Sequence, residues 1–193
     1  MQILHINSSI LGPHSISRDL SAAAVARLSA VHPDATVTYR DLAADPLAHL
    51  SGEGIAALMA GQAHAQDADA LDEFLAADTV VIGVALYNFT VPTQLKAWVD
   101  RLFVPGKTFR YTAAGPEGLA GSKKVILAIA RGGIYAPGTP GRDAEHAETW
   151  LRTVFATFGV TDLEVVVAEG VKLGDEQRDA AVARAKSMIA ELA

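Results

Sequence analysis

The sequence predicts an α/β domain in which helices cover both faces of a parallel sheet. Two apolar runs, residues 80–86 and 125–130, lack the polar alternation of a half-exposed strand. Such runs are typical of strands that are buried on both faces. Segments with helical spacing of apolar residues separate the predicted strands, and this alternation is typical of a doubly wound sheet.

The composition is typical of an ordinary globular protein. A chain of 193 residues can bury one sizeable core, and we expect a single domain over residues 1–193. The formal net charge of −6 argues against a nucleic-acid partner, and the lack of cysteine excludes disulfides and thiolate chemistry. No signal peptide and no apolar run of membrane-spanning length is visible, so we expect a cytoplasmic protein without membrane contact.

The expected elements alternate along the chain. Strands are predicted at residues 2–7, 36–41, 80–86, 123–130 and 163–168, of which 36–41 alternates like an edge strand. Helices are predicted at residues 20–31, 55–59, 67–76, 94–102, 143–158 and 175–192, with Ser17 or a neighbour as the N-cap of the first and Gly159 following the fifth. Residues 103–112 read as an extended aromatic stretch and residues 115–118 as a turn.

The segment 42–66 is irregular and contains Gly52-Glu53-Gly54, the start of an apparent dinucleotide fingerprint. That motif requires a preceding strand, which residues 46–51 do not resemble. We therefore interpret this segment as a surface excursion.

Five strands in a chain of this size fit the flavodoxin-like order 2-1-3-4-5. In open α/β sheets, ligands bind at the carboxyl ends of the strands, beside the point where the strand order reverses. The loops that leave the first, third and fourth strands are therefore the candidate site.

The loop after the first strand carries Ser8, Ser9, Ser15 and Ser17 directly before a helix. A helix N-terminus offers unpaired N–H groups and the positive end of the helix dipole, so these serines could complete a phosphate cradle without a basic residue. The alternative is that they only cap the helix and form turns.

The loops after the third and fourth strands carry different chemistry. Tyr87, Asn88 and Phe89 follow the third strand and could clamp a flat aromatic ligand, or merely pack the loop onto the sheet. Arg131-Gly132-Gly133 follows the fourth strand, where paired glycines permit close approach of a ligand or simply form a turn. Arg131 could equally be a surface charge. A mononucleotide with a flat ring system, such as FMN, would span all three loops.

Several motifs then resemble, in order along nearly the whole chain, the FMN-dependent NADH azoreductases, which are also described as NADH:quinone oxidoreductases. The matching pieces are Ser8-Ser9-Ile10-Leu11, Ser15-Ile16-Ser17, Leu86-Tyr87-Asn88-Phe89 with Pro92, Gln94-Leu95-Lys96, Thr108-Phe109-Arg110-Tyr111-Thr112, Gly115-Pro116-Glu117-Gly118-Leu119 and Arg131-Gly132-Gly133-Ile134.

The resemblance implies where FMN would bind. Ser9, Ser15, Ile16 and Ser17 would hold the phosphate end, Ile16 through its backbone. Leu86, Tyr87, Asn88 and Phe89 would flank the ring, and Ala130, Arg131, Gly132 and Gly133 would contact its other side. The family pattern often has Ser in place of Ala130.

The resemblance also implies an enzyme that works in two strokes. NADH gives hydride to the flavin and leaves, after which two electrons pass to a quinone or an azo bond. The cofactor supplies this chemistry, so no catalytic side chain and no metal is expected. One alternative is a flavodoxin-type electron carrier without NADH turnover of its own, and another is a cofactor-free phosphoester hydrolase with a metal site.

The aromatic stretch suggests how the chain assembles. Phe103, Val104, Phe109 and Tyr111 lie close together in the sequence, and a large exposed apolar patch usually marks an interface. The resemblance likewise implies a twofold homodimer. We therefore expect this patch to be exposed on one chain and covered by the second.

Overall fold

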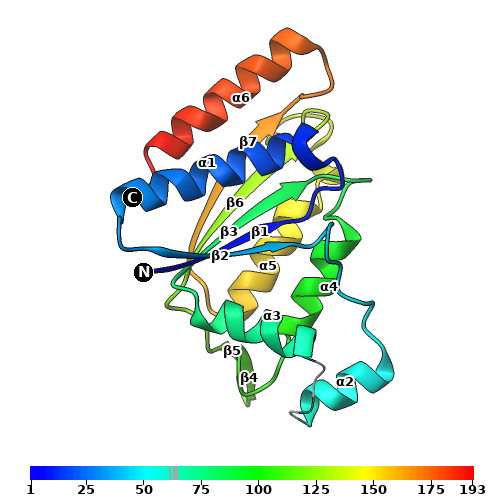
Figure 1. The fold of residues 1–193 in the computed structure, drawn as a ribbon. Coiled ribbons are helices and arrows are strands. Elements are labelled where there is room, and N and C mark those ends of the chain that lie inside the picture. The colour runs from blue at the N-terminus through cyan, green and yellow to red at the C-terminus, as the bar shows by residue number, and fades with distance from the viewer. Residues whose placement is uncertain (61, 63–64) are drawn as a thin grey trace.

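A sheet of five parallel strands forms the centre of the molecule (Figure 1). The computed structural model describes residues 1–60, 62 and 65–193. The strands are β1 (Gln2–Asn7), β2 (Thr36–Asp41), β3 (Thr79–Ala85), β6 (Lys124–Arg131) and β7 (Asp162–Glu169). They stand in the order β2-β1-β3-β6-β7, so the predicted order 2-1-3-4-5 is confirmed, with β6 and β7 as the fourth and fifth strands.

Helices cover both faces of this sheet (Figure 1). On one face lie α1 (Ile16–Val31) and α6 (Asp175–Ala190), and on the other lie α3 (Ala65–Ala76), α4 (Thr93–Leu102) and α5 (Ala147–Thr157). The remaining elements are α2 (Gly52–Met59), the antiparallel hairpin of β4 (Phe109–Thr112) and β5 (Gly115–Gly118), and the short 3₁₀ turns η1 (Gly12–His14) and η2 (Arg142–Ala144). In the described residues, no helix is long and apolar enough to span a bilayer.

The apolar run of β3 is buried over its whole length, as its sequence predicts. Val80, Ile82 and Val84 pack into the core under α3, α4 and α5. Val81 points the other way, into the core under α1 and α6. The strand therefore contributes to both cores, which is why it carries no polar residue after Thr79.

Local hydrogen bonds decide where three elements begin. Ser15 caps α1 by accepting from the backbone N–H of Arg18 at 3.4 Å. Ser51 does the same for α2, which begins earlier than predicted, and no strand precedes it. The prediction that α5 begins at Asp143 is wrong, because the Glu145 carboxylate accepts from the N–H groups of the helix's first turn, and residues 142–144 form a separate 3₁₀ turn.

Residues 115–118 are a strand and not the predicted turn. Gly115–Gly118 pairs with Phe109–Thr112, and Arg110 and Glu117 face each other across the hairpin with an ion pair of 2.7 Å. The turn lies between them, at residues 113–114. Gly and Pro suggested a turn here, but cross-strand pairing outweighed that local preference.

The expected exposed patch is largely absent from the surface. Val104 and Phe109 are buried, and Phe103 packs against the core, with its ring centroid 4.8 Å from that of Phe158. Tyr111 alone of the four is strongly exposed, at 76%. The prediction that these residues are exposed on one chain is wrong for all of them but Tyr111, because this stretch folds back onto its own domain.

The N-terminal turns of α1 pack unusually closely onto β1 and β3. A Cβ atom on Gly83 would lie 2.5 Å from Oδ1 of Asn7, 2.9 Å from the carbonyl oxygen of Ser17 and 3.0 Å from Oγ of Ser21. Glycine at position 83 thus allows α1 to begin directly over the sheet.

We expect Gly83→Ala to lower the free energy of unfolding by about 1–3 kcal/mol, because an added methyl group overpacks this contact. Gly52→Ala is the control, since a Cβ there meets no atom within 4 Å. Urea unfolding of both variants and the wild type measures the effect. A Gly83→Ala protein as stable as the wild type would contradict the close packing.

Candidate functional site

A cavity of about 590 Å³ opens at the carboxyl edge of the sheet, between the loops that leave β1, β3 and β6. Its volume lies in the range of small-molecule sites. Every site residue predicted from the sequence lines it except Arg131: Ser9, Ser15, Ile16, Ser17, Leu86, Tyr87, Asn88, Phe89, Ala130, Gly132 and Gly133. The fold thus brings three separate loops around one space.

The N-terminus of α1 forms one end of the cavity. Ser15 and Ser17 are buried, and their hydroxyl groups lie 3.1 Å apart. The N–H groups of Ile16 and Ser17 belong to the first turn and have no intrahelical acceptor. These neutral donors and the positive end of the helix dipole suit a phosphate group.

The loop after β3 is a tight two-residue turn. Tyr87 and Thr90 exchange backbone hydrogen bonds of 3.0 and 3.1 Å, and Asn88 and Phe89 between them have φ values of 47° and 73°. Two positive φ values are typical of a type I′ turn. The positive φ of Phe89 costs about 1–2 kcal/mol, and the residue is left 53% exposed at the cavity.

Two contacts hold this turn in place. The backbone N–H of His146, at the start of α5, donates to the carbonyl oxygen of Phe89 at 2.9 Å. On the other side, the Tyr87 hydroxyl lies 2.9 Å from Oγ of Ser9. The turn after β3 and the loop after β1 are therefore joined by a direct side-chain contact.

The loop after β6 is fixed by the loop after β7. The N–H groups of Gly170, Val171 and Lys172 donate to the carbonyl oxygens of residues 133, 131 and 132 at 2.8, 3.1 and 3.1 Å. A Cβ on Gly133 would lie 3.3 Å from the Tyr135 ring, and one on Gly132 would lie 3.2 Å from the Lys172 side chain. The glycines thus leave room for side chains that themselves line the cavity.

Arg131 does not line the cavity, and the alternative that it is a surface charge is also wrong. Its side chain is 3% exposed and lies 2.6 Å from the Glu148 carboxylate, 3.3 Å from Glu145 and 3.7 Å from Glu169. Burial alone would raise the pKa of Glu148, but hydrogen bonds from Arg152 and Arg131 hold it below its ordinary value. Arg131 therefore fastens the end of β6 to α5 and β7 from behind the site.

Several lining residues were not predicted from the sequence or had no role assigned there. These are Leu11, His14, Ala85, Tyr135, Val171, Lys172 and Arg178. Val171 and Lys172 follow β7, so the carboxyl-edge rule, applied to the fifth strand as well, would have found them. In the part of the chain that the structure describes, no cluster of His, Asp or Glu suited to a metal ion is present.

Comparisons with known proteins agree with this geometry. Residues 1–192 match the protein family described as having a flavodoxin-like fold. An FMN-dependent NADH:quinone oxidoreductase of Methylorubrum populi is 56% identical over 200 residues, covering 100% of this chain and 98% of the relative. A protein of the same name from Xanthomonas campestris is 55% identical over 199 residues, covering 98% of each.

A solved structure supports the same relationship. The crystal structure of an azoreductase from Bacillus anthracis superposes with a TM-score of 0.88 at 32% identity, covering 100% of both chains.

The strained turn gives a test of the site's geometry. We expect Phe89→Gly to be more stable than Phe89→Ala by about 1 kcal/mol, because glycine adopts a positive φ without strain. Both variants lose the same half-exposed ring, so their difference isolates the backbone. Urea unfolding of the two proteins measures it, and an alanine variant at least as stable as the glycine variant would contradict the strain.

Proposed function

Because this chain belongs to the family of flavodoxin-like fold that includes the FMN-dependent NADH:quinone oxidoreductases, we propose that it is an FMN-dependent enzyme of this activity. It uses NADH to reduce quinones and cleaves azo compounds reductively. The single observation that carries this proposal is the cavity itself, which places a phosphate cradle at one end and an aromatic turn and a glycine loop at the other.

The residues at the cradle fit the phosphate end of FMN. Ser9, Ser15 and Ser17 offer hydroxyl donors, and the first turn of α1 offers the N–H groups of Ile16 and Ser17. Charge-assisted hydrogen bonds of this kind contribute about 1.5–3 kcal/mol each. The cradle therefore binds a dianion through neutral donors in a protein whose net charge is −6, and Lys172 and Arg178 also line the cavity.

The residues at the other end fit a flat ring. Leu86, Tyr87, Asn88 and Phe89 would flank it from the β3 side, and Ala130, Gly132 and Gly133 from the β6 side. Ala130 has no hydroxyl to offer, so contacts on that side are apolar or come from the backbone. Backbone N–H groups in these loops would stabilise negative charge that develops on the heterocycle.

FMN, when bound, would accept hydride from NADH and pass two electrons to the acceptor. The chain binds and orients the ring, and the half-exposed Phe89 borders the opening through which donor and acceptor stack. No side chain has to act as a nucleophile or as a dedicated acid. Arg131 supports the neighbouring glycines and does not itself contact FMN, since its side chain is turned away and paired and its carbonyl oxygen accepts from Val171.

We expect the purified protein to contain one FMN per chain and to follow ping-pong kinetics with NADH and a benzoquinone or an azo dye. The reason is that one opening must serve both substrates in turn. Chromatography of the released cofactor and initial-rate measurements test this. FAD, no flavin, or intersecting initial-rate plots would contradict it, and FMN without NADH turnover would instead indicate an electron carrier.

We also propose that the active form is a homodimer in which a second copy of the chain covers the cavity opening. Ile10, Leu11 and Phe89 are each more than half exposed, and Leu11 and Phe89 border the cavity. Exposed apolar side chains gathered at a site are typical of an interface. In a twofold dimer the same surface would serve both subunits.

Sedimentation velocity at assay concentration should therefore show a dimer, and Leu11→Glu should shift it toward the monomer and lower the FMN content. Met188→Glu is the control, because Met188 is equally exposed but lies on the outer side of the domain, on α6. A monomer that retains FMN and full activity would contradict the shared site.

A further inference from the structure

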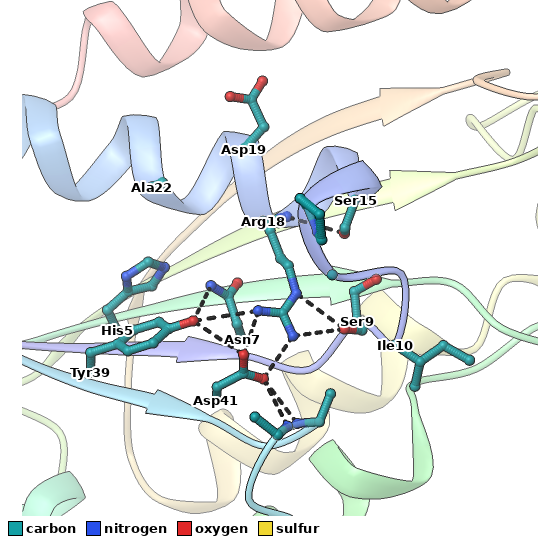
Figure 2. Close-up of a pocket in the computed structure, with 14 residues that line it drawn as sticks. His5, Asn7, Ser9, Ile10, Ser15, Arg18, Asp19, Ala22, Tyr39 and Asp41 are labelled. Atoms are coloured by element: carbon teal, nitrogen blue, oxygen red, sulfur yellow. Dashed lines mark hydrogen bonds and ion pairs between the residues drawn. The ribbon is translucent and has the colours of Figure 1, made fainter.

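A second cavity, of about 770 Å³, is lined by the loop that follows β1, by α1 and by the end of β2 (Figure 2). Its floor holds His5 and Asn7 of β1, and its walls hold Arg18 of α1 and Asp41 of β2. Ser9 and Ser15 line both cavities. The loop that carries the phosphate cradle therefore lies against a second set of polar side chains, which includes Arg18 and Asp41.

Arg18 is the centre of this structure (Figure 2). Its guanidinium forms a bidentate pair with Asp41, at 2.6 and 2.7 Å. Its Nε and Nη2 atoms donate to the carbonyl oxygen of Ser9 at 3.1 and 2.8 Å. Because the guanidinium fork is planar and rigid, it fixes the direction of that carbonyl group relative to both α1 and β2.

The peptide group between Ser9 and Ile10 is consequently held from both sides. Its carbonyl oxygen points to Arg18, and its N–H group donates to the Tyr87 hydroxyl at 3.3 Å. The Ser9 hydroxyl, on the cofactor side, also lies 2.9 Å from the Tyr87 hydroxyl. The direction in which Ser9 presents its hydroxyl therefore depends on the guanidinium behind it.

We propose that Arg18, held by Asp41, is a positioning residue for the phosphate end of FMN and acts through the Ser9 carbonyl. This inference rests on the proposed function, because it assumes that FMN occupies the first cavity. Arg18 is not itself a phosphate ligand: Nε and both terminal nitrogens already donate to Ser9, Asp41 and, at 3.4 Å, Tyr39.

The surroundings keep this arrangement in one charge state. The hydrogen bond from Arg18 lowers the pKa of Asp41 below its usual range, so the carboxylate remains ionised. Behind the pair, His5 lies 2.9 Å from the Ser21 hydroxyl, which donates to Asn7 at 3.0 Å. Burial, assisted by the charge of Arg18, lowers the pKa of His5 to about 4, so this histidine is neutral at physiological pH.

A purely structural role is the competing explanation, and the chain offers a matched control for it. Arg40 and Glu73 form an equally bidentate pair, at 2.8 and 2.9 Å, that joins β2 to α3 on the other face of the sheet. Its side chains are buried to a similar extent as those of Arg18 and Asp41. Arg40 makes no contact with the cradle loop among the described residues.

The test compares FMN with riboflavin, which has the same ring but lacks the phosphate. Apoprotein of the full chain is titrated with each flavin, and flavin fluorescence gives the two Kd values. We expect Arg18→Met to lower the ratio of the riboflavin Kd to the FMN Kd about tenfold or more, the scale of one charge-assisted hydrogen bond. Asp41→Asn should lower the ratio in the same direction, and Arg40→Met should leave it unchanged.

The outcomes separate the alternatives. If Arg18→Met weakens both flavins equally, or if Arg40→Met lowers the ratio as much, the pair has only a structural role and the inference is overturned. If Asp41→Asn tightens FMN binding, Arg18 acts as a direct cation and the inference is overturned as well. A wild-type protein with no preference for FMN would overturn the proposed function itself. Asp41→Asn decides the matter if Arg18→Met does not fold.

Discussion

The close packing of α1 onto the sheet at Gly83 is the constraint on which the rest of the structure depends. Asn7, the Ser17 carbonyl oxygen and Ser21 occupy the space that a Cβ atom at position 83 would need. The Ser8 hydroxyl donates to the Gly83 carbonyl at 2.8 Å, so the loop that starts the cradle is attached to the same point. A helix N-terminus binds an anion only where its first turn faces the ligand. By fixing where α1 begins relative to β1 and β3, this contact turns a generic helix end into one end of a cavity.

The phosphate cradle itself is built from neutral groups, and two buried ion-pair clusters stand behind the loops of the site. Arg18 with Asp41 supports the loop after β1, and Arg131 with three carboxylates supports the loop after β6. Paired charges away from solvent form short, directional hydrogen bonds that hold backbone in place. The cradle therefore presents hydroxyl and backbone donors to a ligand, while Lys172 and Arg178 also line the cavity, in a protein whose overall charge is negative. This arrangement combines rigid loops with a cradle that does not rely on bulk electrostatic attraction.

The aromatic turn shows how strain is maintained at the site. Asn88 and Phe89 adopt positive φ values that residues other than glycine rarely adopt. The exchange of hydrogen bonds between Tyr87 and Thr90, and the bond from His146 to Phe89, over-determine this conformation. The strained backbone places the Phe89 ring at the opening of the cavity instead of in the core.

The sequence by itself determined the sheet, its strand order and more than half of the cavity lining. Unbroken apolar runs such as residues 80–86 can only be satisfied between two layers of helices, and parallel strands must then place their exit loops at one edge. It could not determine what each polar side chain does, because that depends on partners distant in the sequence. Arg131 looked like a surface charge, yet Glu145, Glu148 and Glu169 meet it only after folding. Phe109 looked like part of an interface, yet its own domain buries it, and residues 115–118 looked like a turn until a strand paired with them. Likewise, only the tertiary structure brings Arg18 to both Ser9 and Asp41, because that contact requires α1 to be seated beside β2.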